Sequence, residues 1–433
     1  MSPLSSAEFA ALMEGLGFDD TRGLGAGAEI VVGVSGGADS LALTFLADIW
    51  ARARGGRVIG LIVDHGLRPE AAAEAAETAA LLSRLGIAQR ILRLRGLGPG
   101  PGIQARARGA RLALLQAAAS ELGVPFLLLG HHAADQAETL LLRALDGSGP
   151  AGMAGMAARR ETRDIALLRP LLTTKPGRLR ATLTAADIPW HTDPSNADPR
   201  FLRARLRRSL AGRDGDGSAT AALVRAAALA GRRRAGEERA RAALLAARVA
   251  LHPEGYALLT PGPIAPAALA ALIRVLGGAE FAPSERRVAS LAACPAPATL
   301  AGVRLVPAGR LGPGWLIMRE AQAMAPPVPA IPGIRWDGRF RLALASCPPA
   351  GASLGALGAA GAARLRRRSS LPAAVLASLP ALRVGEELAA VPHLGYPDER
   401  TCARVPVLFS PNEPAAGAPF MILDPGGDAE MSR

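Results

Sequence analysis

Short apolar runs alternate with alanine-rich stretches between about residue 30 and residue 211. Apolar runs of this length predict buried strands, and the stretches between them predict helices. Strands are expected at residues 30–34, 58–63, 89–94 and 126–130, and helices at 38–53, 69–86, 104–122, 133–145 and 175–186. This alternation is typical of an α/β fold with a doubly wound parallel sheet, in which ligands bind at the carboxyl ends of strands.

Two breaks in the pattern predict domain boundaries. A Gly/Asp-rich break covers residues 212–218, and a proline-rich break covers residues 326–333. Between them, residues 219–249 form a long alanine- and arginine-rich stretch that predicts a helix. We therefore expect three domains: residues 1–213, a helical domain at 214–325, and a small mixed domain at 333–433 whose last twenty or so residues are disordered.

The most informative segment follows the first predicted strand and reads Ser35-Gly36-Gly37-Ala38-Asp39-Ser40. Glycines let the backbone approach an anion, and the amides at the start of the following helix can bind phosphate together with the two serine hydroxyls. A carboxylate among phosphates requires a cation, so Asp39 indicates a magnesium–nucleotide complex. The segment resembles the loop of the PP-loop ATP pyrophosphatase superfamily, although a plain glycine-rich turn is the alternative.

Composition favours a nucleic-acid partner. The 433 residues contain 50 Lys and Arg against 37 Asp and Glu, a net charge of +13. Codon bias explains the choice of arginine over lysine but does not alone explain the excess of positive charge. Cys294, Cys347 and Cys402 lack the spacing of a metal site or disulfide framework. With no signal-peptide pattern and no apolar run of about 18 residues, we expect a cytoplasmic protein.

The ends of two other predicted strands carry polar residues. The second strand ends in Val63-Asp64-His65-Gly66-Leu67-Arg68-Pro69, and the fourth is followed by Gly130-His131-His132-Ala133-Ala134-Asp135-Gln136-Ala137-Glu138-Thr139. An acid in the first turn of a helix suits the helix dipole, which is also the simple structural explanation of Asp135. A glycine-spaced loop follows at residues 147–156.

Basic residues recur further along the chain. Arg203 and Arg207 share a helix face, with Arg205 between them, and Arg232, Arg233 and Arg234 lie in the long predicted helix. They are either a solvated basic face or contacts to phosphates, which the net charge favours.

Taken in order, the segments resemble the tRNA(Ile)-lysidine synthetase family over residues 28–210. The matching motifs are the PP-loop, Val-Asp-His-Gly-Leu-Arg-Pro, Gln-Ala-Arg-Ala-Arg at 104–108, His-His-X-X-Asp-Gln-Ala-Glu-Thr, Gly-Ser-Gly with Gly-Met, Arg-Pro-Leu-Leu and Asp-Pro-Ser-Asn. The sequence departs from the family pattern at Ala134, Asp146, Arg178 and Ala204.

The resemblance implies ligation of free lysine to C2 of the wobble cytidine of a CAU-anticodon isoleucine tRNA, through an adenylated cytidine, with ATP and Mg²⁺. Residues 1–213 would be the catalytic domain and 214–325 would contact tRNA; a homodimer is left open. It implies these roles: catalysis by Asp39, Asp135 and Glu138; ATP binding by Ser35, Gly36, Gly37, Ala38, Asp39 and Ser40; substrate contacts by His131, His132 and Arg106; and tRNA contacts by Arg203, Arg205, Arg207 and Arg232–Arg234.

Two alternative functions are weighed against this one. A small-molecule amidating ligase of the NAD or GMP synthetase type shares the PP-loop but not the His-His and Asp-Pro-Ser-Asn segments. A non-catalytic RNA-binding homologue is suggested by the four departures, but the retention of Asp39 argues against it.

Overall fold

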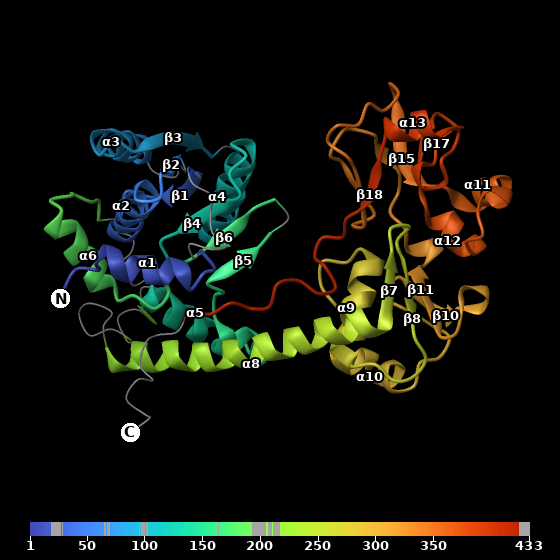
Figure 1. Cartoon of the computed structure of the whole chain (residues 1–433), viewed down its shortest axis with the longest axis horizontal. Coiled ribbons are helices and arrows are strands. Elements are labelled where there is room, and N and C mark those ends of the chain that lie inside the picture. The colour runs from blue at the N-terminus through green and yellow to red at the C-terminus, as the bar shows by residue number, and fades with distance from the viewer. Residues whose placement is uncertain are drawn as a thin grey trace. The chain divides into compact units, whose positions relative to one another are not determined.

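The chain folds into two units. The structure, a computed structural model, describes residues 1–18, 27, 29–64, 66, 70–94, 96, 100, 103–162, 164–192, 205–206, 210 and 217–423, without the side chains of 103–105. Unit 1 comprises residues 1–236 and 418–433, and unit 2 comprises residues 237–417 (Figure 1). The break at residue 236 lies inside a long helix, whereas we expected a boundary at residue 213.

Unit 1 is an α/β domain. Its elements are α1 (Ser6–Glu14), β1 (Glu29–Val34), α2 (Ala38–Arg52), β2 (Arg57–Asp64), α3 (Ala71–Arg84), β3 (Ala88–Arg93), α4 (Ile103–Glu121), β4 (Phe126–Leu129), α5 (Ala133–Leu145), η1 (Gly152–Ala154), β5 (Arg159–Glu161), β6 (Ala166–Leu168), α6 (Pro176–Ala185) and the first part of α8 (Ser218–Arg248). Every strand and helix predicted for this region is confirmed, each within two residues of its expected ends.

The sheet of unit 1 has the order β3-β2-β1-β4-β6-β5 among the described residues. β1 pairs in parallel with β2 and β4, and β4 pairs in parallel with β6. This confirms the doubly wound parallel sheet. The sequence analysis missed α1, the parallel strand β6, and β5, a short edge strand antiparallel to β6.

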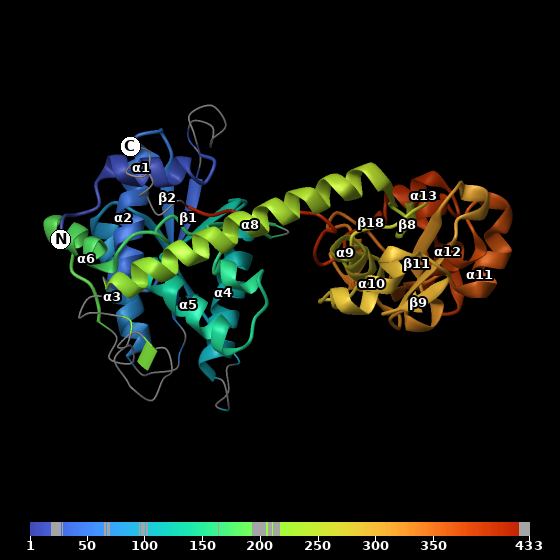
Figure 2. The same cartoon turned by 90° about the horizontal axis from the view of Figure 1, so that it is seen from below.

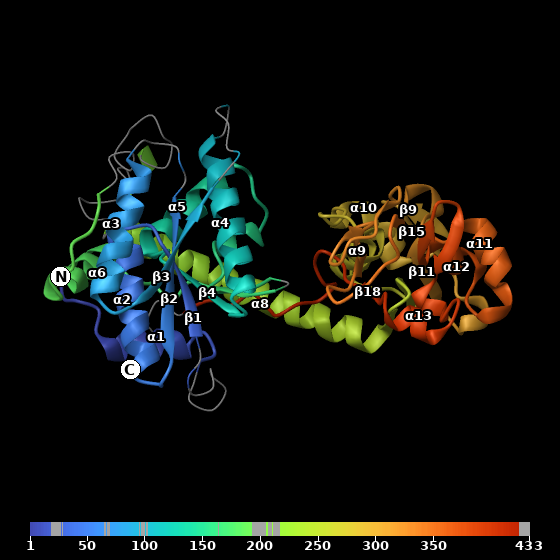
Figure 3. The same ribbon diagram turned by 90° about the horizontal axis from the view of Figure 1, so that it is seen from above.

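Alternate residues of β1 face two separate apolar cores. Ile30, Val32 and Val34 pack with α1, α2 and α6 on one face, whereas Val31 packs with Leu115 of α4 on the other. Figure 3 shows the sheet between α2 and α3 on one side and α4 on the other. Successive side chains of a strand point to opposite faces of the sheet, and both faces of β1 are buried. Nearly every residue of the strand is therefore apolar.

The strand order reverses at β1. The connections through α2 and α3 extend the sheet to β3 on one side, and the connection through α4 returns to β4 on the other. In open parallel sheets, ligands bind at this switch point, beyond the carboxyl ends of the two central strands. The loops after β1 and β4 are those that carry the PP-loop and the His-His segment.

Unit 2 combines helices with antiparallel sheets. Its elements are the rest of α8, β7 (Val249–His252), β8 (Tyr256–Leu259), α9 (Pro266–Gly277), α10 (Glu285–Ala293), β9 (Ala298–Leu300), β10 (Val303–Pro307), η3 (Gly309–Leu311), β11 (Trp315–Arg319), η4 (Ala321–Ala323), β12 (Val328–Pro329), β13 (Arg335–Trp336), β14 (Phe340–Leu342), β15 (Ala352–Ala356), α11 (Gly358–Leu365), η5 (Arg366–Arg368), α12 (Ala373–Ser378), β16 (Pro380–Val384), β17 (Glu387–Ala390), η6 (Pro392–Leu394), α13 (Glu399–Ala403) and β18 (Val407–Phe409).

The region expected to be a helical domain contains α8, α9 and α10, but they share it with a sheet of order β7-β8-β11-β10-β9. β7 and β8 form a hairpin whose turn includes Gly255 at φ +82°. Such a turn residue between two apolar runs was a hairpin signal, and the alanine-rich context obscured it.

The described part of the C-terminal region also differs from expectation; residues 424–433, likewise expected to be disordered, lie outside the described residues. Residues 418–423 belong to unit 1, and Leu423 is buried in the core cluster that contains α1 and α2. The Pro/Gly/Ala composition predicted disorder for this region, but the apolar run Phe420-Met421-Ile422-Leu423 provides enough buried surface to dock it.

Among the described residues, no helix is both long enough and apolar enough to span a bilayer.

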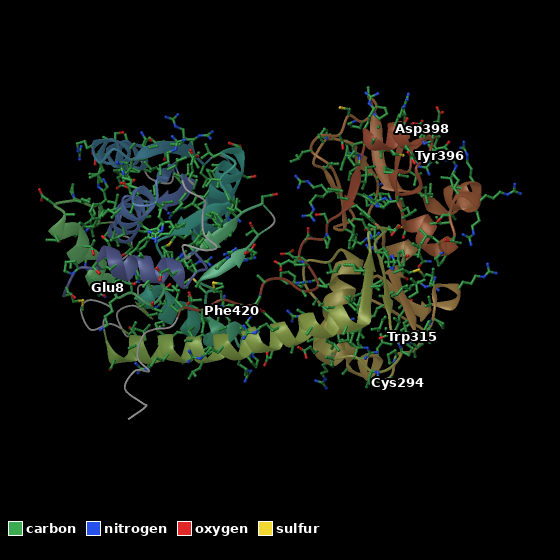
Figure 4. All side chains as sticks on the ribbon, viewed as in Figure 1. Glu8, Cys294, Trp315, Tyr396, Asp398 and Phe420 are labelled. Carbon is green, nitrogen blue, oxygen red and sulfur yellow. The ribbon has the colours of Figure 1, made fainter. Side chains whose placement is uncertain are left out.

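Arg178, one of the departures from the family pattern, fixes the N-terminal helix. Its guanidinium donates to the carbonyls of Ser2 (3.3 Å) and Pro3 (2.8 Å) and to the carboxylate of Glu8 (2.8 Å). Glu8 also accepts from the amide and hydroxyl of Ser5, which caps α1. These bonds, first those from Ser5 and then that from Arg178, lower the pKa of Glu8 from 4.5 to about 2. Figure 4 labels Glu8 on α1.

Glu8 is therefore expected to make stability depend on pH. Because its folded pKa is depressed, its contribution is complete above pH 4.5 and is lost as pH falls toward about 2. Glu8→Gln should lower the urea midpoint at pH 7, and the difference from wild type should shrink at pH 3. Glu14→Gln, on the same helix, is the control. An equal difference at both pH values would contradict the assignment.

Candidate active site

The segment from Ser35 to Ser40 forms a compact loop between β1 and α2. The Ser40 hydroxyl accepts from the Ser35 amide (3.0 Å), donates to the Gly37 carbonyl (3.1 Å), and lies 3.1 Å from the Ser35 hydroxyl. Gly37 is the N-cap of α2 and makes no side-chain cap bond. The first amides of α2 have no acceptor within the helix and can therefore bind an anion, as a phosphate cradle requires.

Position 36 strongly favours glycine. Its φ is +77°, and a β-carbon there would lie 2.5 Å from Oγ1 of Thr78 and 3.1 Å from Cδ2 of His191. The left-handed backbone is disfavoured for other residues. The loop is thus held between α3 and the segment that follows α6.

His191 is a residue that the sequence analysis missed. Its amide donates to the Gly36 carbonyl (3.0 Å), and it forms an isolated parallel bridge with Gly37. Its Nε2 lies 3.4 Å from the carboxylate of Glu77. His191 directly precedes Thr192 and the Asp-Pro-Ser-Asn motif, and that adjacency was the available signal; the motif itself, residues 193–196, lies outside the described residues.

Gly130 brings the end of β4 against the start of α2. A β-carbon at Gly130 would lie 3.1 Å from the Asp39 carbonyl oxygen and from the Ser40 amide nitrogen. These are backbone atoms at a helix start, which cannot easily move. The absent side chain lets the residues after β4 reach the PP-loop.

His132 lies between carboxylates from both central strand ends. Its Nε2 is 3.4 Å from Oδ2 of Asp39 on α2 and 3.5 Å from Oδ2 of Asp135 on α5. The Asp135 carboxylate also accepts from the His132 amide (3.1 Å) and caps α5. His132 is buried, with 7% of its surface exposed, whereas the Asp39 side chain is 39% exposed. The structure therefore brings together three of the predicted site residues.

His131 is neutral and faces an arginine. Burial lowers its pKa to about 3; Asp135 opposes this, and Arg169 and Arg108 reinforce it. Nε2 of His131 lies 2.9 Å from Nη2 of Arg108, so the neutral ring accepts a hydrogen bond there. The ring proton then resides on Nδ1.

Arg108 was also missed, because Arg106 was expected to supply the cation. Arg106 is exposed and lies near Gly100. Arg108 is also exposed, but its guanidinium is the one that reaches His131, with Nη2 2.9 Å from Nε2 of that ring. Its place beside Arg106 in the Gln-Ala-Arg-Ala-Arg motif was the available signal.

Glu138 lies one turn after Asp135 on α5, and its side chain is fully buried. The spacing of three residues places both carboxylates on one helix face, as expected. A bound amine would have to reach Glu138 in the interior, beneath Asp135.

The predicted RNA-contacting arginines behave differently from one another. Arg203 and Arg207 lie outside the described residues. Arg205 is exposed, as are Arg232 and Arg233 on α8, whereas Arg234 is half-buried and donates to the Ala151 carbonyl (3.1 Å). For Arg205, Arg232 and Arg233, a contact to RNA stays a prediction. Arg234 instead makes a contact within unit 1.

The donor set fits a magnesium–nucleotide complex. The described residues contain no cluster of three or more His, Cys, Asp or Glu suited to a resident metal. Mg²⁺ in nucleotide sites usually takes one or two carboxylates and the substrate's phosphates. Asp39, partly exposed beside the cradle, would supply such a carboxylate.

Comparison with known proteins identifies the domain and the family. A family model described as a PP-loop domain matches residues 18–213, which defines unit 1 as an ATP-binding PP-loop domain. The chain is 50% identical to the tRNA(Ile)-lysidine synthase of Rhodopseudomonas palustris over 205 residues, which cover 47% of this chain and 59% of that relative. Longer matches exist to the synthases of a Methylobacterium species (43% identity; 65% of this chain, 85% of the relative) and Mesorhizobium japonicum (36%; 85% and 84%). The chain belongs to the tRNA(Ile)-lysidine synthase family.

Two adjacent glycines should differ in their tolerance of alanine. Gly36→Ala is expected to cost at least about 1–2 kcal/mol of unfolding free energy, because it forces a β-carbon into left-handed backbone. Gly37→Ala meets only ordinary contacts, at 3.5 Å from the Ser35 hydroxyl, and should cost about 0.5 kcal/mol as an N-cap change. Urea unfolding without nucleotide measures both. Equal costs would contradict the conformation assigned to Gly36.

Proposed function

We propose that the chain joins free lysine to C2 of the wobble cytidine in the CAU anticodon of an isoleucine tRNA, converting ATP to AMP and pyrophosphate. The observation that carries the proposal is the convergence of a phosphate cradle with Asp39, His132 and Asp135 at one switch point. Family membership supports the same reaction. No observation favours the amidating-ligase alternative.

In the first step, the cytidine O2 attacks the α-phosphate of ATP and pyrophosphate leaves. Phosphoryl transfer of this kind depends mainly on positioning and on stabilisation of charge. The amides at the start of α2 and the Ser35 and Ser40 hydroxyls would hold the leaving pyrophosphate. Mg²⁺ held by Asp39 would neutralise negative charge on the phosphates when bound.

In the second step, the lysine ε-amine attacks C2. A C–N bond forms, the C2–O bond breaks, and the oxygen leaves with AMP. The amine has a solution pKa of about 10.4, so it must lose a proton in the site. Asp135 and Glu138 would bind the ammonium and accept that proton. Arg108, placed by the neutral His131, would offer a cation to the departing adenylate.

The last part of the proposal concerns how the tRNA and its wobble cytidine bind. A wobble cytidine is unpaired in the anticodon loop and can enter the crevice at the strand ends. The exposed Arg205, Arg232 and Arg233 would contact phosphates along the tRNA. A reaction that needs tRNA, ATP and free lysine belongs in the cytoplasm.

Mass spectrometry of tRNA tests the function directly. Incubation with ATP and lysine should add the mass of lysine less water to a cytidine, with one pyrophosphate released per modification. Asp39→Asn should lower pyrophosphate release by about a hundredfold or more, because the charge that places the cation is lost. Unmodified tRNA from the wild-type protein would refute the proposal, and wild-type release by the variant would refute the role of Asp39.

Asp135→Asn should separate the two steps. The amide keeps an oxygen that can cap α5 at the His132 amide but cannot bind or deprotonate the amine. Adenylated RNA should therefore accumulate with labelled ATP, while lysine transfer falls by about a hundredfold. If both steps slowed equally, Asp135 would have no separate role in the lysine step.

A further inference from the structure

The chain leaves unit 1 through α8, forms unit 2, and returns to unit 1 at residues 418–423, here called the C-terminal segment. The Met421 carbonyl accepts a hydrogen bond from the Ala158 amide (2.9 Å). Leu423 lies in the unit 1 core, 3.0 Å from where a β-carbon on Gly15 would stand. The segment is therefore an integral part of the catalytic unit.

A glycine in the middle of α8 marks where the segment crosses the helix. A β-carbon on Gly231 would lie 2.4 Å from Cγ2 of Ile422 and 3.2 Å from Cε1 of Phe420. Glycine inside a helix costs about 0.5–1 kcal/mol relative to alanine. The close contact with the segment explains why this helix has a glycine at that position. Figure 2 shows α8 passing across unit 1 beside α5, as Figure 1 also does.

Phe420 covers the side chain of Arg234. The guanidinium lies 4.5 Å from the centre of the Phe420 ring, within cation–π range, and its Nη1 donates to the Ala151 carbonyl (3.1 Å). Phe420 is labelled beside α8 in Figure 4. Arg234 is thus held between the C-terminal segment on one side and the glycine loop, residues 147–156, on the other.

The glycine loop is in turn fixed to α5. Arg143 of α5 donates to the carbonyls of Gly152 (2.8 Å) and Gly155 (2.6 Å), and burial, then the charge of Arg234, lowers the pKa of Arg143. The Gln136 amide donates to the Met156 carbonyl (3.1 Å) and accepts from its amide (2.8 Å). Gln136 stands directly after Asp135 in the first part of α5.

We infer that Arg234, clamped by the C-terminal segment, is a positioning residue that sets the glycine loop and, through Gln136, the α5 carboxylates for the lysine step. The expected effect on lysine kinetics rests on the proposed function. The expected effect on the structure of the glycine loop does not. Arg234 is thereby removed from the set of RNA contacts. Arg233, one position away and exposed, keeps that role.

Steady-state kinetics of four variants should show whether Arg234 positions the α5 carboxylates or contacts RNA. Arg234→Gln and Phe420→Ala should raise the KM for lysine roughly tenfold, since small displacements of a catalytic group have effects of this size or larger. The KM for ATP should change little, because the PP-loop lies between β1 and α2 rather than on α5. Arg234→Lys, which keeps one donor for Ala151, should recover part of the loss. Arg225→Gln, at an exposed position on the same helix that is assigned no role in catalysis or tRNA binding, is the control and should leave the KM for lysine unchanged.

In the salt dependence of tRNA binding, we expect the variant at Arg233 to differ from wild type and the variant at Arg234 to match it. Arg233→Gln should reduce the log–log slope by roughly 0.7–0.9, as expected for one lost phosphate contact, whereas Arg234→Gln should leave the slope unchanged. A reduced slope for Arg234→Gln with an unchanged KM for lysine would overturn the inference and return Arg234 to the RNA-binding set.

Amide hydrogen exchange tests the clamp without any assay of activity. In Phe420→Ala, the amides of Met156 and Ala158 should exchange faster than in wild type, while those of β1 keep their protection. Unchanged exchange at both amides would overturn the inference even if lysidine is made. Faster exchange in a protein that makes no lysidine would support the clamp and refute only the proposed function.

Discussion

The site depends on the close approach of β4 to the first turn of α2. At Gly130 a methyl group would be crowded, because backbone atoms of Asp39 and Ser40 would lie 3.1 Å from a β-carbon and would have to shift by a few tenths of an ångström. This contact allows His132 to stand between Asp39 and Asp135. A parallel sheet whose order reverses at β1 provides the two loops, and the missing side chain lets them join into one site.

The electrostatics of the site suit anionic substrates. Arg108 lies against His131, and the buried Arg169 donates to the Ala157 carbonyl (2.8 Å). Burial, then the neighbouring arginines Arg160, Arg108 and Arg143, lowers the pKa of Arg169 to about 10, so it stays charged at neutral pH. The same environment keeps His131 neutral. Positive charge is thus fixed on arginines that do not titrate near pH 7, while the carboxylates are the groups proposed to bind the metal and the amine.

The sequence predicted most of unit 1, because strands buried on both faces leave continuous apolar runs and the PP-loop has a distinctive pattern. What it did not predict depends on contacts between distant residues. His191 reaches the loop through its backbone, so its side-chain identity carries little signal. Arg178 appeared only as a departure from a family pattern, yet it pairs with Glu8 about 170 residues away. The C-terminal segment looked disordered by composition, since only four apolar residues mark its docking surface.

The account is tested most directly by following one oxygen atom. A tRNA whose wobble cytidine carries oxygen-18 at O2 would be incubated with the wild-type protein, ATP and lysine, and the AMP analysed by mass spectrometry. If the cradle holds ATP so that O2 attacks the α-phosphate, the label leaves C2 with the departing group. The account therefore predicts labelled AMP in amounts equal to the lysidine formed. Unlabelled AMP formed together with lysidine would show that the base is not adenylated at O2 and would contradict it.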